Sequence, residues 1–563
     1  MFVVATAGHV DHGKSTLVER LTGMWPDRLA EEQRRGLTID LGFAWARFDG
    51  RDIAFVDVPG HERFVANMLA GCGPMPRDSP VMFVVAATEG WMPQSDEHLD
   101  ALRALGARHV LVVISKADLA DPDHAIAQAR QRLPDSPIAL GTDLNDVRAE
   151  LISLVDRLPA PDRGADVRLW VDRSFTVRGA GTVVTGTLAA GTVGVGDELE
   201  HRGGRVTVRG LQSLGRDRDE VGAVARVAVN LRGVERGHIG RGDTLRTPGA
   251  WLDTTEIDAL LRHSGELHRQ LTLHIGSAAV PVQVRPLGEA GARLRLARPL
   301  PLRVGDIGLL RDPGEHRIAA GVEVLDVRPP ALRRRGAARD RGEELATGRV
   351  ARPPCARAEE LRAMGFETSG ARIGDWVVDE QWWAARRRQM MAAVRDWSAD
   401  NDIAAGMPLG TLRQRSGLPA AELLGPLLEG TGLQVGDGVV RQPGAGLPER
   451  VDKAVRTVEE WLAAEPFRAP EADELVGLEL GPRELAAAVR AGRLARIADG
   501  VMLGADAVER AAEILRALPQ PFTAAEAKRA LHTTRRVAIP LLELLDARRL
   551  TRRDPDGTRT VVT

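Results

Sequence analysis

A glycine-rich loop near the N-terminus carries the residues best suited to chemistry. The run Gly8-His-Val-Asp-His-Gly13-Lys14-Ser15 has the spacing G-x-x-x-x-G-K-S, between an apolar strand pattern over residues 2–7 and a helical pattern over residues 16–21. In that context successive backbone N–H groups point at phosphate oxygens, aided by the helix N-terminus. Lys14 would add a point charge for the β- and γ-phosphates, and the Ser15 hydroxyl would bind Mg²⁺. The loop predicts a nucleoside triphosphate site, and the alternative is a chance glycine-rich turn.

Three later segments complete the predicted site. A strand pattern ends in Asp57, which can hold Mg²⁺ through water, and the N–H of Gly60 can then sense a γ-phosphate. Thr38 lies between the two motifs and can bring a hydroxyl to the metal. A later buried strand pattern leads into S-K-x-D, where the carboxylate of Asp118 can accept both N–H donors of guanine. Each of these residues alone could be a cap or turn residue, but their order and spacing together indicate a guanine nucleotide site.

The predicted ligand-binding residues all come from these four segments. The nucleotide-binding set is Gly8, His9, Val10, Asp11, His12, Gly13, Lys14, Ser15, Thr16, Asp57, Gly60, Ser115, Lys116 and Asp118. The predicted metal ligands are Ser15, Thr38 and Asp57, whose oxygen atoms suit Mg²⁺. Strand and helix patterns surround them, so we expect an α/β P-loop GTPase domain over residues 1–163.

The motifs G-H-V-D-H-G-K-S, R-R-G-L-T-I-D, D-V-P-G-H-E-R-F and S-K-A-D together resemble those of translational GTPases of the elongation factor Tu class. The resemblance implies that His61 is catalytic and orients the attacking water. It implies that Asp11 coordinates a monovalent cation beside the phosphates. Val10 and Leu37 would form an apolar gate that holds His61 away until the ribosome triggers hydrolysis. Without the resemblance, His61 would be interpreted as a partly exposed loop histidine.

The sequence departs from that family in three places. Ser115 replaces the usual Asn, which loses an amide that would brace the loop, whereas Asp118 keeps the selectivity for guanine. The fifth guanine-contact element, normally a Ser-Ala pair, is expected within residues 136–142, where no clear pair occurs. The proline-rich connection over residues 72–80 is longer than the family's loop, and the sequence assigns it no role.

Composition sets the limits for the rest of the chain. Its 563 residues, 44% of them hydrophobic, can bury several domain cores. The 76 basic and 78 acidic side chains nearly cancel, which neither supports nor excludes nucleic acid as a partner. Only Cys72 and Cys355 occur, which excludes a disulfide scaffold and fits a reducing cytoplasm. No signal-peptide pattern and no apolar run long enough to cross a membrane is present, so we expect a cytoplasmic protein without a membrane partner.

Two strand-rich segments follow the first domain. Short β-type runs with glycine punctuation occupy residues 164–250 and 251–330, and this pattern is typical of β-barrels. We therefore expect two consecutive barrels, and the family resemblance implies that the first of them binds aminoacyl-tRNA. A linker rich in Pro and Arg begins at Arg328.

The last third of the sequence repeats with a period of about 60 residues. Asp-Gly pairs begin at Asp437, Asp499 and Asp556, each between β-type runs and after helical patterns, and Gly374-Asp375 resembles a fourth, degenerate turn. An Asp-Gly pair between such runs is a strong hairpin signal. The repeat predicts four winged-helix domains, at residues 331–385, 386–445, 446–505 and 506–563.

The last repeat has a basic surface. From Pro521 onward it holds nine Lys or Arg against five acids. Helix N-terminal side chains beside a basic wing can bind phosphates. The predicted RNA-binding residues are Thr534, Arg535, Arg536, Arg552 and Arg553. The alternative is an ordinary solvated basic face.

A Tu-like GTPase with two barrels and four winged helices resembles the bacterial selenocysteine-specific elongation factors over essentially the whole chain. The resemblance implies a monomer that carries selenocysteinyl-tRNA with GTP and Mg²⁺ to a ribosome stalled at an in-frame UGA codon. GTP would be hydrolysed there to GDP and phosphate, while the tail holds an mRNA hairpin. Tethering by the tail would raise the local concentration of the factor at that codon.

The same resemblance places the amino acid pocket in the first barrel, at Asp172, Arg173 and Arg226. A selenol is ionised at neutral pH whereas a serine hydroxyl is neutral, so the two arginines would favour selenocysteine and reject the seryl precursor. Asp172 could pair with the aminoacyl ammonium group or orient an arginine. The alternative is that these residues form ordinary surface ion pairs.

Three other functions remain compatible with the sequence. The chain could be a general elongation factor of the same class that carries any aminoacyl-tRNA. It could be a GTP-gated DNA-binding regulator, because winged helices commonly bind DNA. It could also be a GTP-dependent scaffold with little hydrolysis.

Overall fold

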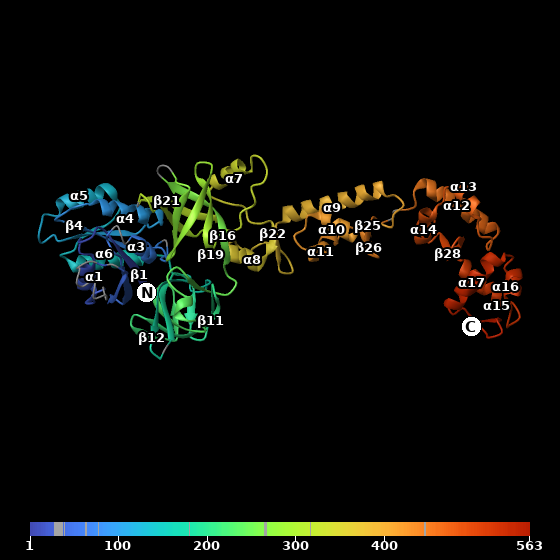
Figure 1. Cartoon of the computed structure of the whole chain (residues 1–563), viewed down its shortest axis with the longest axis horizontal. Helices are drawn as coiled ribbons and strands as arrows, with labels where there is room; N and C mark the ends of the chain where they lie inside the picture. The colour runs from blue at the N-terminus through green and yellow to red at the C-terminus, as the bar shows by residue number, and fades with distance from the viewer. Residues whose placement is uncertain are drawn as a thin grey trace. The chain divides into compact units, whose positions relative to one another are not determined.

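The computed structural model describes residues 1–26, 38, 40–61, 65–76, 78–179, 181–263, 267–315, 317–443 and 446–562. The chain forms two compact units, Met1–Ser369 and Gly370–Thr563, and each unit is described by itself (Figure 1). None of the described helices is both long and apolar enough to cross a membrane.

The first domain is a doubly wound α/β fold. Its sheet has the order β2-β3-β1-β4-β5-β6, parallel except for β2 on β3. The strands are β1 (Phe2–Ala7), β2 (Gly42–Phe48), β3 (Arg51–Asp57), β4 (Val81–Ala86), β5 (Val110–Ser115) and β6 (Ile138–Leu140). The helices are α1 (Lys14–Thr22), α3 (Val65–Cys72), α4 (Pro93–Ala104), α5 (Asp123–Arg132) and α6 (Leu144–Asp156). Because helices cover both faces, β4 and β5 are buried along their whole length.

The second domain is a closed six-stranded barrel. Its order is β10-β15-β7-β8-β14-β11, and β11 pairs back onto β10, while β12 extends the sheet. Inward and outward residues alternate along β14, which buries Ala225, Val227, Val229 and Leu231. The strands are β7 (Arg168–Val177), β8 (Gly181–Leu188), β9 (Thr192–Gly194), β10 (Glu198–His201), β11 (Gly204–Ser213), β12 (Arg216–Arg218), β13 (Glu220–Gly222), β14 (Ala225–Arg232) and β15 (Thr244–Arg246).

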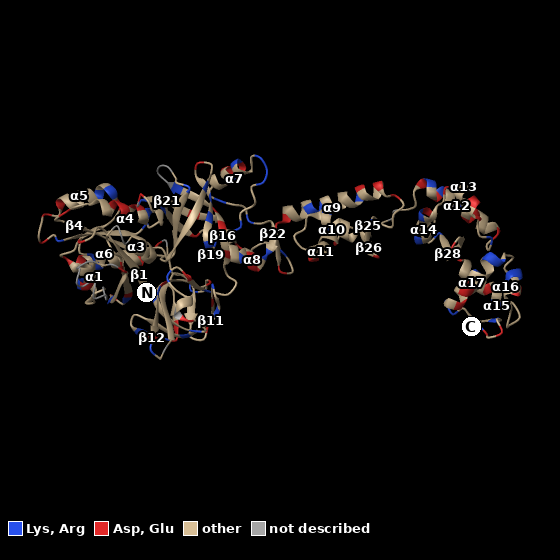
Figure 2. Cartoon of the chain, in the orientation of Figure 1, with Lys and Arg blue, Asp and Glu red and all other residues tan. Residues whose placement is uncertain are grey.

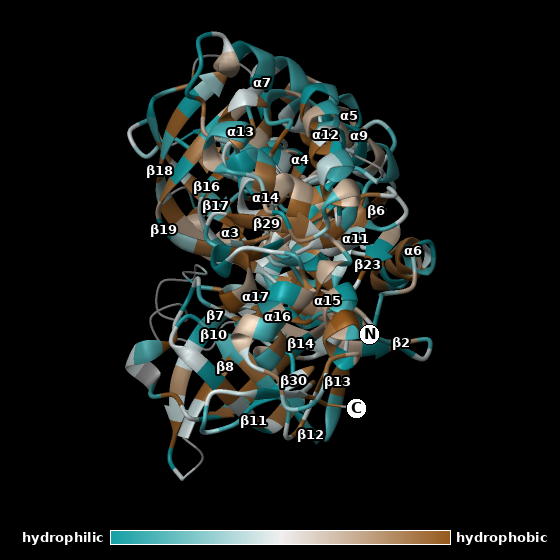
Figure 3. Cartoon of the chain, turned by 90° about the vertical axis from the view of Figure 1, so that its right-hand side faces the viewer, coloured by the Kyte–Doolittle hydropathy of each residue, from teal (hydrophilic) through white to brown (hydrophobic). Residues whose placement is uncertain are grey.

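A second barrel follows, with the closed order β16-β19-β18-β17-β20-β21. Burial alternates along β18, and Val280, Val282 and Val284 belong to the core. Figure 3 colours the strands of this barrel by hydropathy. The strands are β16 (Leu252–His263), β17 (Gln270–Ile275), β18 (Ala278–Leu287), β19 (Gly291–Leu302), β20 (Ile307–Arg311) and β21 (Ile318–Asp326). Both predicted barrels are therefore present.

The segment predicted as the first winged helix, residues 331–385, contains helices and a hairpin that turns at the predicted Gly374-Asp375. It contains α7 (Ala337–Ala346), β22 (Cys355–Arg357), α8 (Ala358–Met364), β23 (Ala371–Ile373) and β24 (Trp376–Val378), and the border between the two units falls inside it. Arg341 of α7 is buried and bonds to Asp258 and Asp326 of the second barrel. This buried ion network fixes α7 to the barrel, which a local sequence pattern does not reveal. The predicted border at residue 385 also falls inside the unbroken helix α9 (Glu380–Asp400).

The second unit contains three repeats of helices followed by a hairpin. The first consists of α9, β25 (Met407–Pro408), α10 (Leu409–Ser416), α11 (Leu424–Leu428), β26 (Gln434–Gly436) and β27 (Val439–Arg441). The second consists of α12 (Glu449–Ala464), α13 (Ala472–Gly477), α14 (Pro482–Arg490), β28 (Leu494–Ala498) and β29 (Val501–Gly504). The third consists of α15 (Ala507–Arg516), α16 (Ala524–Ala530), α17 (Arg535–Ala547), β30 (Thr551–Arg553) and β31 (Arg559–Val561).

The Asp-Gly pairs lie at the hairpin turns, as expected from the sequence. At the first of them, Asp437 and Gly438 have φ of 50° and 74°, the conformation that tight hairpins require. The last two repeats share one hydrophobic core, whereas the first repeat has its own.

Candidate functional site

The glycine-rich loop connects β1 to α1, as its motif predicts. The ammonium group of Lys14 is buried and donates to the carbonyl oxygens of Gly8 and His9, at 3.0 and 2.7 Å. Gly8 has φ of 122°, and a Cβ there would lie 2.2 Å from the carbonyl oxygen of Val84. Only glycine therefore allows the loop to pass β4 so closely.

The three predicted metal ligands meet beside this loop. The Ser15 hydroxyl donates to the carboxylate of Asp57 at 2.6 Å, and it lies 3.0 Å from the Thr38 hydroxyl. A further hydroxyl, that of Thr6, donates to the other Asp57 oxygen at 2.6 Å and accepts from the N–H of Val58. Two hydroxyls and a carboxylate thus converge on one point, which is a donor set that fits Mg²⁺.

A cavity of about 220 Å³ adjoins this cluster. Its lining comes from the loop, from Trp25 and from the three later segments: Val10, Asp11, Gly13, Lys14, Ser15, Thr16, Trp25, Thr38, Gly60 and Lys116. A Cβ on Gly60 would lie 2.5 Å from the Lys14 nitrogen, so the backbone of residue 60 lies directly against the loop. The cavity therefore joins the predicted phosphate, metal and γ-phosphate positions.

The predicted catalytic residue, His61, directly follows Gly60, which lines this cavity. His61 is half-buried, and its charge, when protonated, lowers the pKa of His9, although burial of His9 is the larger cause. Val10 is half-buried at the cavity, and Asp11 is exposed with φ of 61°. Leu37, the other half of the predicted gate, lies outside the described residues.

Helix α4 supplies contacts to the loop that sequence reasoning missed. The N–H of Gly8 donates to Nδ1 of His98 at 3.2 Å, and the N–H of Val10 donates to the side-chain oxygen of Gln94 at 3.4 Å. Burial lowers the pKa of His98 to about 3, so the ring is neutral and can accept this bond. Burial likewise lowers the pKa of His12 to about 4. Gly8 and His98 are 90 residues apart in the sequence, Val10 and Gln94 are 84 apart, and no motif connects either pair.

The predicted guanine side lies at the end of β5. The Ser115 hydroxyl donates to the carbonyl oxygen of His12 at 2.6 Å, so this serine does brace the loop, contrary to the expectation. Lys116 has φ of 52° and lies 3.3 Å from Glu89, and Asp118 is exposed. The N–H of Gly141 donates to the carbonyl oxygen of Ile114, which brings the end of β6 beside this turn.

The three residues of the predicted aminoacyl pocket come together on the first barrel. Asp172 is fully buried, and its carboxylate accepts from Arg226 at 2.5 Å and from the Thr185 hydroxyl at 2.6 Å. A register shift between Val171 and Arg173 marks a bulge, which re-aims these neighbouring side chains. Of the two roles considered for Asp172, the structure shows the orientation of an arginine.

Phe43 of β2 completes this group, and no sequence motif predicted its place here. The guanidinium carbons of Arg173 and Arg226 lie 5.0 and 4.0 Å from the centre of its ring. A cavity of about 270 Å³ opens here between the GTPase domain and the barrel, and Trp45 and Phe175 also line it. Two arginines and an aromatic ring therefore face one partly apolar space.

In the last repeat, the predicted RNA-binding residues separate into two groups. Thr534, Arg535, Arg552 and Arg553 are exposed, at the start of α17 and on β30. Figure 2 shows the Lys and Arg residues of the chain in blue. Arg536 instead donates to the carbonyl oxygens of Gly500 and Ala469 and lies 3.0 Å from Glu471. Arg536 therefore joins the last two repeats.

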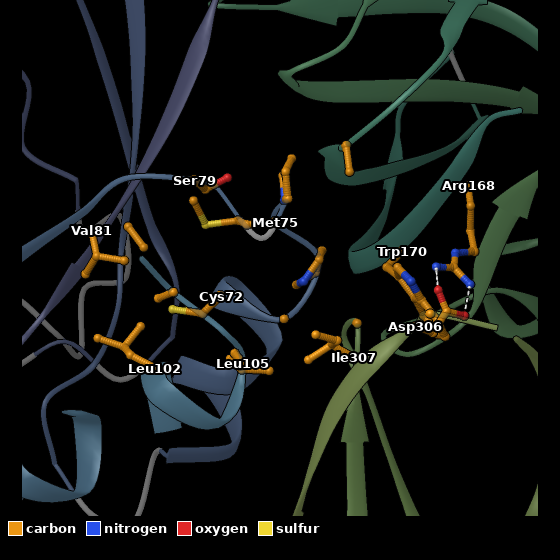
Figure 4. A pocket seen from close by; sticks show the side chains of 18 residues that line it. Cys72, Met75, Ser79, Val81, Leu102, Leu105, Arg168, Trp170, Asp306 and Ile307 are labelled. Atoms are coloured by element: carbon orange, nitrogen blue, oxygen red, sulfur yellow. Dashed lines mark hydrogen bonds and ion pairs between the residues drawn. The ribbon is translucent and has the colours of Figure 1, made fainter. Parts of the chain in front are cut away.

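The proline-rich connection lines a further cavity, of about 210 Å³, where the first domain meets both barrels (Figure 4). Cys72 and Met75 face it from one side, and Trp170 and Ile307 from the barrels. At its edge Arg168 forms two bonds of 2.6 Å with Asp306, which tie one barrel to the other. The connection thus packs at the junction of three domains.

Two family models match the chain. Residues 1–275 match the elongation factor Tu GTP binding domain, and residues 513–560 match the winged helix of elongation factor SelB. The selenocysteine-specific elongation factor of Desulfomicrobium baculatum is 37% identical over 359 residues, which cover 58% of this chain and 55% of that protein. Its counterpart from Escherichia coli (strain K12) is 38% identical over 347 residues, covering 58% and 56%. The chain spans about half the length of the curated relatives it matches.

Solved structures support the same fold. A crystal structure of a bacterial selenocysteine-specific elongation factor aligns over 100% of both chains with a TM-score of 0.70, at 24% identity. Elongation factor SelB of Methanococcus maripaludis, in complex with a GTP analogue, aligns over 58% of this chain and 79% of its own, with a TM-score of 0.51 at 24% identity. At this identity the likeness concerns the fold alone. The sequence matches and the fold together show that the chain is similar to the selenocysteine-specific elongation factors, and that its N-terminal 275 residues match the elongation factor Tu GTP binding domain.

Proposed function

We propose that this chain delivers selenocysteinyl-tRNA, bound together with GTP, to a ribosome stalled at an in-frame UGA codon. The observation that carries the proposal is the arginine pair over Phe43, with Arg226 oriented by the buried carboxylate of Asp172. This group adjoins the GTPase domain, so an aminoacyl group bound there would lie beside the nucleotide-binding domain.

The nucleotide site would work through its own backbone and side chains. The loop N–H groups and Lys14 would bind the phosphates in place of the present bonds from Lys14 to Gly8 and His9. Ser15 and Thr38 would hold Mg²⁺ directly and Asp57 through water, and the bound ion would neutralise charge on the β- and γ-phosphates. Asp118 would select guanine, and the end of β6 would contact the base from the other side.

Hydrolysis to GDP and phosphate would depend on His61. Gly60 lies against the loop and Lys14, so the neighbouring imidazole is close to the γ-phosphate position. From there it would orient the attacking water, and Val10 would limit its approach before the ribosome binds. Asp11, exposed on the loop, would coordinate the monovalent cation.

The aminoacyl pocket would select by charge. A selenolate would accept charge-assisted hydrogen bonds from Arg173 and Arg226, whereas a neutral seryl hydroxyl would gain less from either arginine. The bond from Arg226 to Asp172 fixes the guanidinium before the ligand arrives, which lowers the entropic cost of binding. Because the side chain of Arg226 is only 13% exposed, water weakens its interaction less than at an open surface.

The last repeat would bind the mRNA hairpin. Arg535, Arg552 and Arg553 present exposed charges that can contact phosphates. Arg536 would keep the last two repeats in a fixed arrangement. Binding of the hairpin beside the codon would then tether the factor at the correct position. We propose that the protein acts as a monomer.

The test is competition between selenocysteinyl-tRNA and seryl-tRNA for the GTP-bound protein at fixed salt. We expect Arg226→Ala to weaken selenocysteinyl-tRNA binding by about tenfold to a hundredfold, the worth of one charge-assisted bond, with little change for seryl-tRNA. Arg205→Ala, which changes an exposed arginine of the same barrel, is the matched control. Equal weakening for both tRNAs would make Arg226 a general tRNA contact, and a wild-type protein without preference would refute the proposal.

A further inference from the structure

Asp40 joins the nucleotide domain to the first barrel by two arginines. Its carboxylate accepts from Arg173 at 3.2 Å and from Arg241 at 2.6 Å. Arg173 also donates to the carbonyl oxygen of Leu41, the next residue. The three charged side chains are between 25% and 33% exposed, so they form a partly buried cluster rather than an open surface pair.

The same cluster continues into the candidate aminoacyl pocket. Arg173 is one of the two arginines over Phe43, and Phe43 lies three residues after Asp40. Arg241 donates to the backbone carbonyl oxygen of Asp172 at 2.9 Å, and it also bonds to Asn67 of α3. Asp40 therefore contacts one pocket arginine directly and the pocket carboxylate residue through Arg241.

On its other side, Asp40 is coupled by the backbone to the candidate metal site. Thr38 lies two residues earlier, and its hydroxyl is 3.0 Å from that of Ser15. Two residues of chain reach at most about 7 Å, so Thr38 cannot move far from the metal site without also displacing Asp40.

We propose that Asp40 is a positioning residue that makes amino acid selection depend on the bound nucleotide. While Thr38 is held at the metal site by GTP, Asp40 keeps Arg173 over Phe43 and Arg241 against Asp172. When Thr38 is released, Asp40 is released with it, and the pocket loses the partner that orders Arg173. This inference rests on the proposed function, and it adds the residue through which the nucleotide acts on the pocket.

The first experiment measures the affinity of the full-length protein for selenocysteinyl-tRNA and seryl-tRNA, loaded with either a non-hydrolysable GTP analogue or GDP. Asp40→Asn should lower the affinity of the GTP form for selenocysteinyl-tRNA by about tenfold to a hundredfold, as for a lost charge-assisted contact, and leave the GDP form unchanged. Asp40→Glu keeps the charge and should restore part of the loss. Equal loss in both variants, unchanged binding in Asp40→Asn or tighter binding would each overturn the proposal.

A matched control is Glu97→Gln. Glu97 on α4 lies 3.9 Å from Arg311 on β20. Like Asp40, it is a carboxylate of the GTPase domain that faces an arginine of a barrel, but this pair is not at the aminoacyl pocket. It should leave the preference for selenocysteinyl-tRNA within about twofold of wild type, because a weak ion pair contributes little. A Glu97→Gln effect as large as that of Asp40→Asn would show that domain contact in general matters, and not Asp40.

The second experiment needs no tRNA and therefore separates this inference from the proposed function. Phenylglyoxal modifies accessible arginines, and mass spectrometry can locate the modified residues. In the wild type, Arg173 and Arg241 should react more slowly in the GTP-analogue form than in the GDP form, whereas in Asp40→Asn both forms should react alike. A wild-type protein with equal rates in both forms refutes the inference, even if tRNA selection is confirmed. The expected protection in a protein that does not prefer selenocysteinyl-tRNA would refute the proposed function alone.

Discussion

The hydroxyl of Ser115 donates a 2.6 Å hydrogen bond to the carbonyl oxygen of His12, so the end of β5 holds the phosphate loop in place. Ser115 is only 8% exposed, and the bond therefore forms away from water. One hydroxyl thus connects the loop that is expected to bind phosphate to the end of β5, which is expected to bind guanine.

Ser115→Ala should weaken nucleotide binding without abolishing it. The change leaves the His12 carbonyl oxygen without this donor, which costs about 1 kcal/mol, or roughly fivefold in affinity for both GTP and GDP. Isothermal titration with each nucleotide is the measurement, and Ser153→Ala on the outer helix α6 is the control. An unchanged affinity would mean that the bond does not brace the loop.

His61→Ala should separate binding from hydrolysis. The imidazole follows Gly60 at the loop but is not among the groups expected to bind phosphate, so GTP affinity should stay within about twofold. Ribosome-stimulated hydrolysis should fall by roughly two orders of magnitude or more, as for the loss of a water-orienting group. Single-turnover hydrolysis with saturating ribosomes gives the rate. Stimulated turnover at the wild-type level would remove His61 from the mechanism.

Arg535→Ala and Arg536→Ala should have different effects on hairpin binding and on thermal stability, although the two residues are adjacent. Arg535 is exposed, so its loss should weaken binding of an mRNA hairpin and reduce the salt slope by about one. Arg536 bonds to carbonyl oxygens of the preceding repeat, so its loss should lower the thermal stability of the tail and leave the salt slope nearly unchanged. Hairpin titrations at several salt concentrations, with a thermal melt, distinguish the two. If Arg536→Ala reduced the slope as Arg535→Ala does, Arg536 would contact RNA.

The buried histidine of α4 predicts a pH dependence of stability. The pKa of His98 is about 3 when folded and near 6.5 when unfolded, so between these values the unfolded state binds more protons. The stabilisation is complete above pH 6.5, and it is lost as the pH falls from there towards 3, by up to about 1.4 kcal/mol per pH unit. His98→Asn should flatten this dependence. Hydrogen exchange of the β1 amides at pH 7 and pH 5 reports it, and an equal pH effect in the variant would contradict the assignment.

Local patterns were sufficient for much of the fold. The loop over residues 8–15, the alternation along β14 and the Asp-Gly turns each involve residues that are close in the sequence, so their types and spacing predicted the elements. Local patterns did not predict how the segment over residues 331–385 packs. Its residue Arg341 pairs with Asp258 and Asp326 of the second barrel, which are 83 and 15 residues away in the sequence. A helical pattern gives no information on which domain will hold the helix.

The sequence by itself determined the candidate chemistry of this protein: the motifs expected to bind phosphate, metal and guanine, and the charged residues of the first barrel and the tail. Only the tertiary structure decided how those groups act on one another. It brought His98 into hydrogen-bond contact with the phosphate loop and placed the ring of Phe43 against Arg173 and Arg226. It also placed Asp40 between two arginines of the barrel. It also bound Arg536 to its neighbouring repeat, although this side chain is still 39% exposed. The physical reason is that motif residues meet through one turn of chain, whereas these pairs are brought together only when separate sheets and barrels pack and bury their partners.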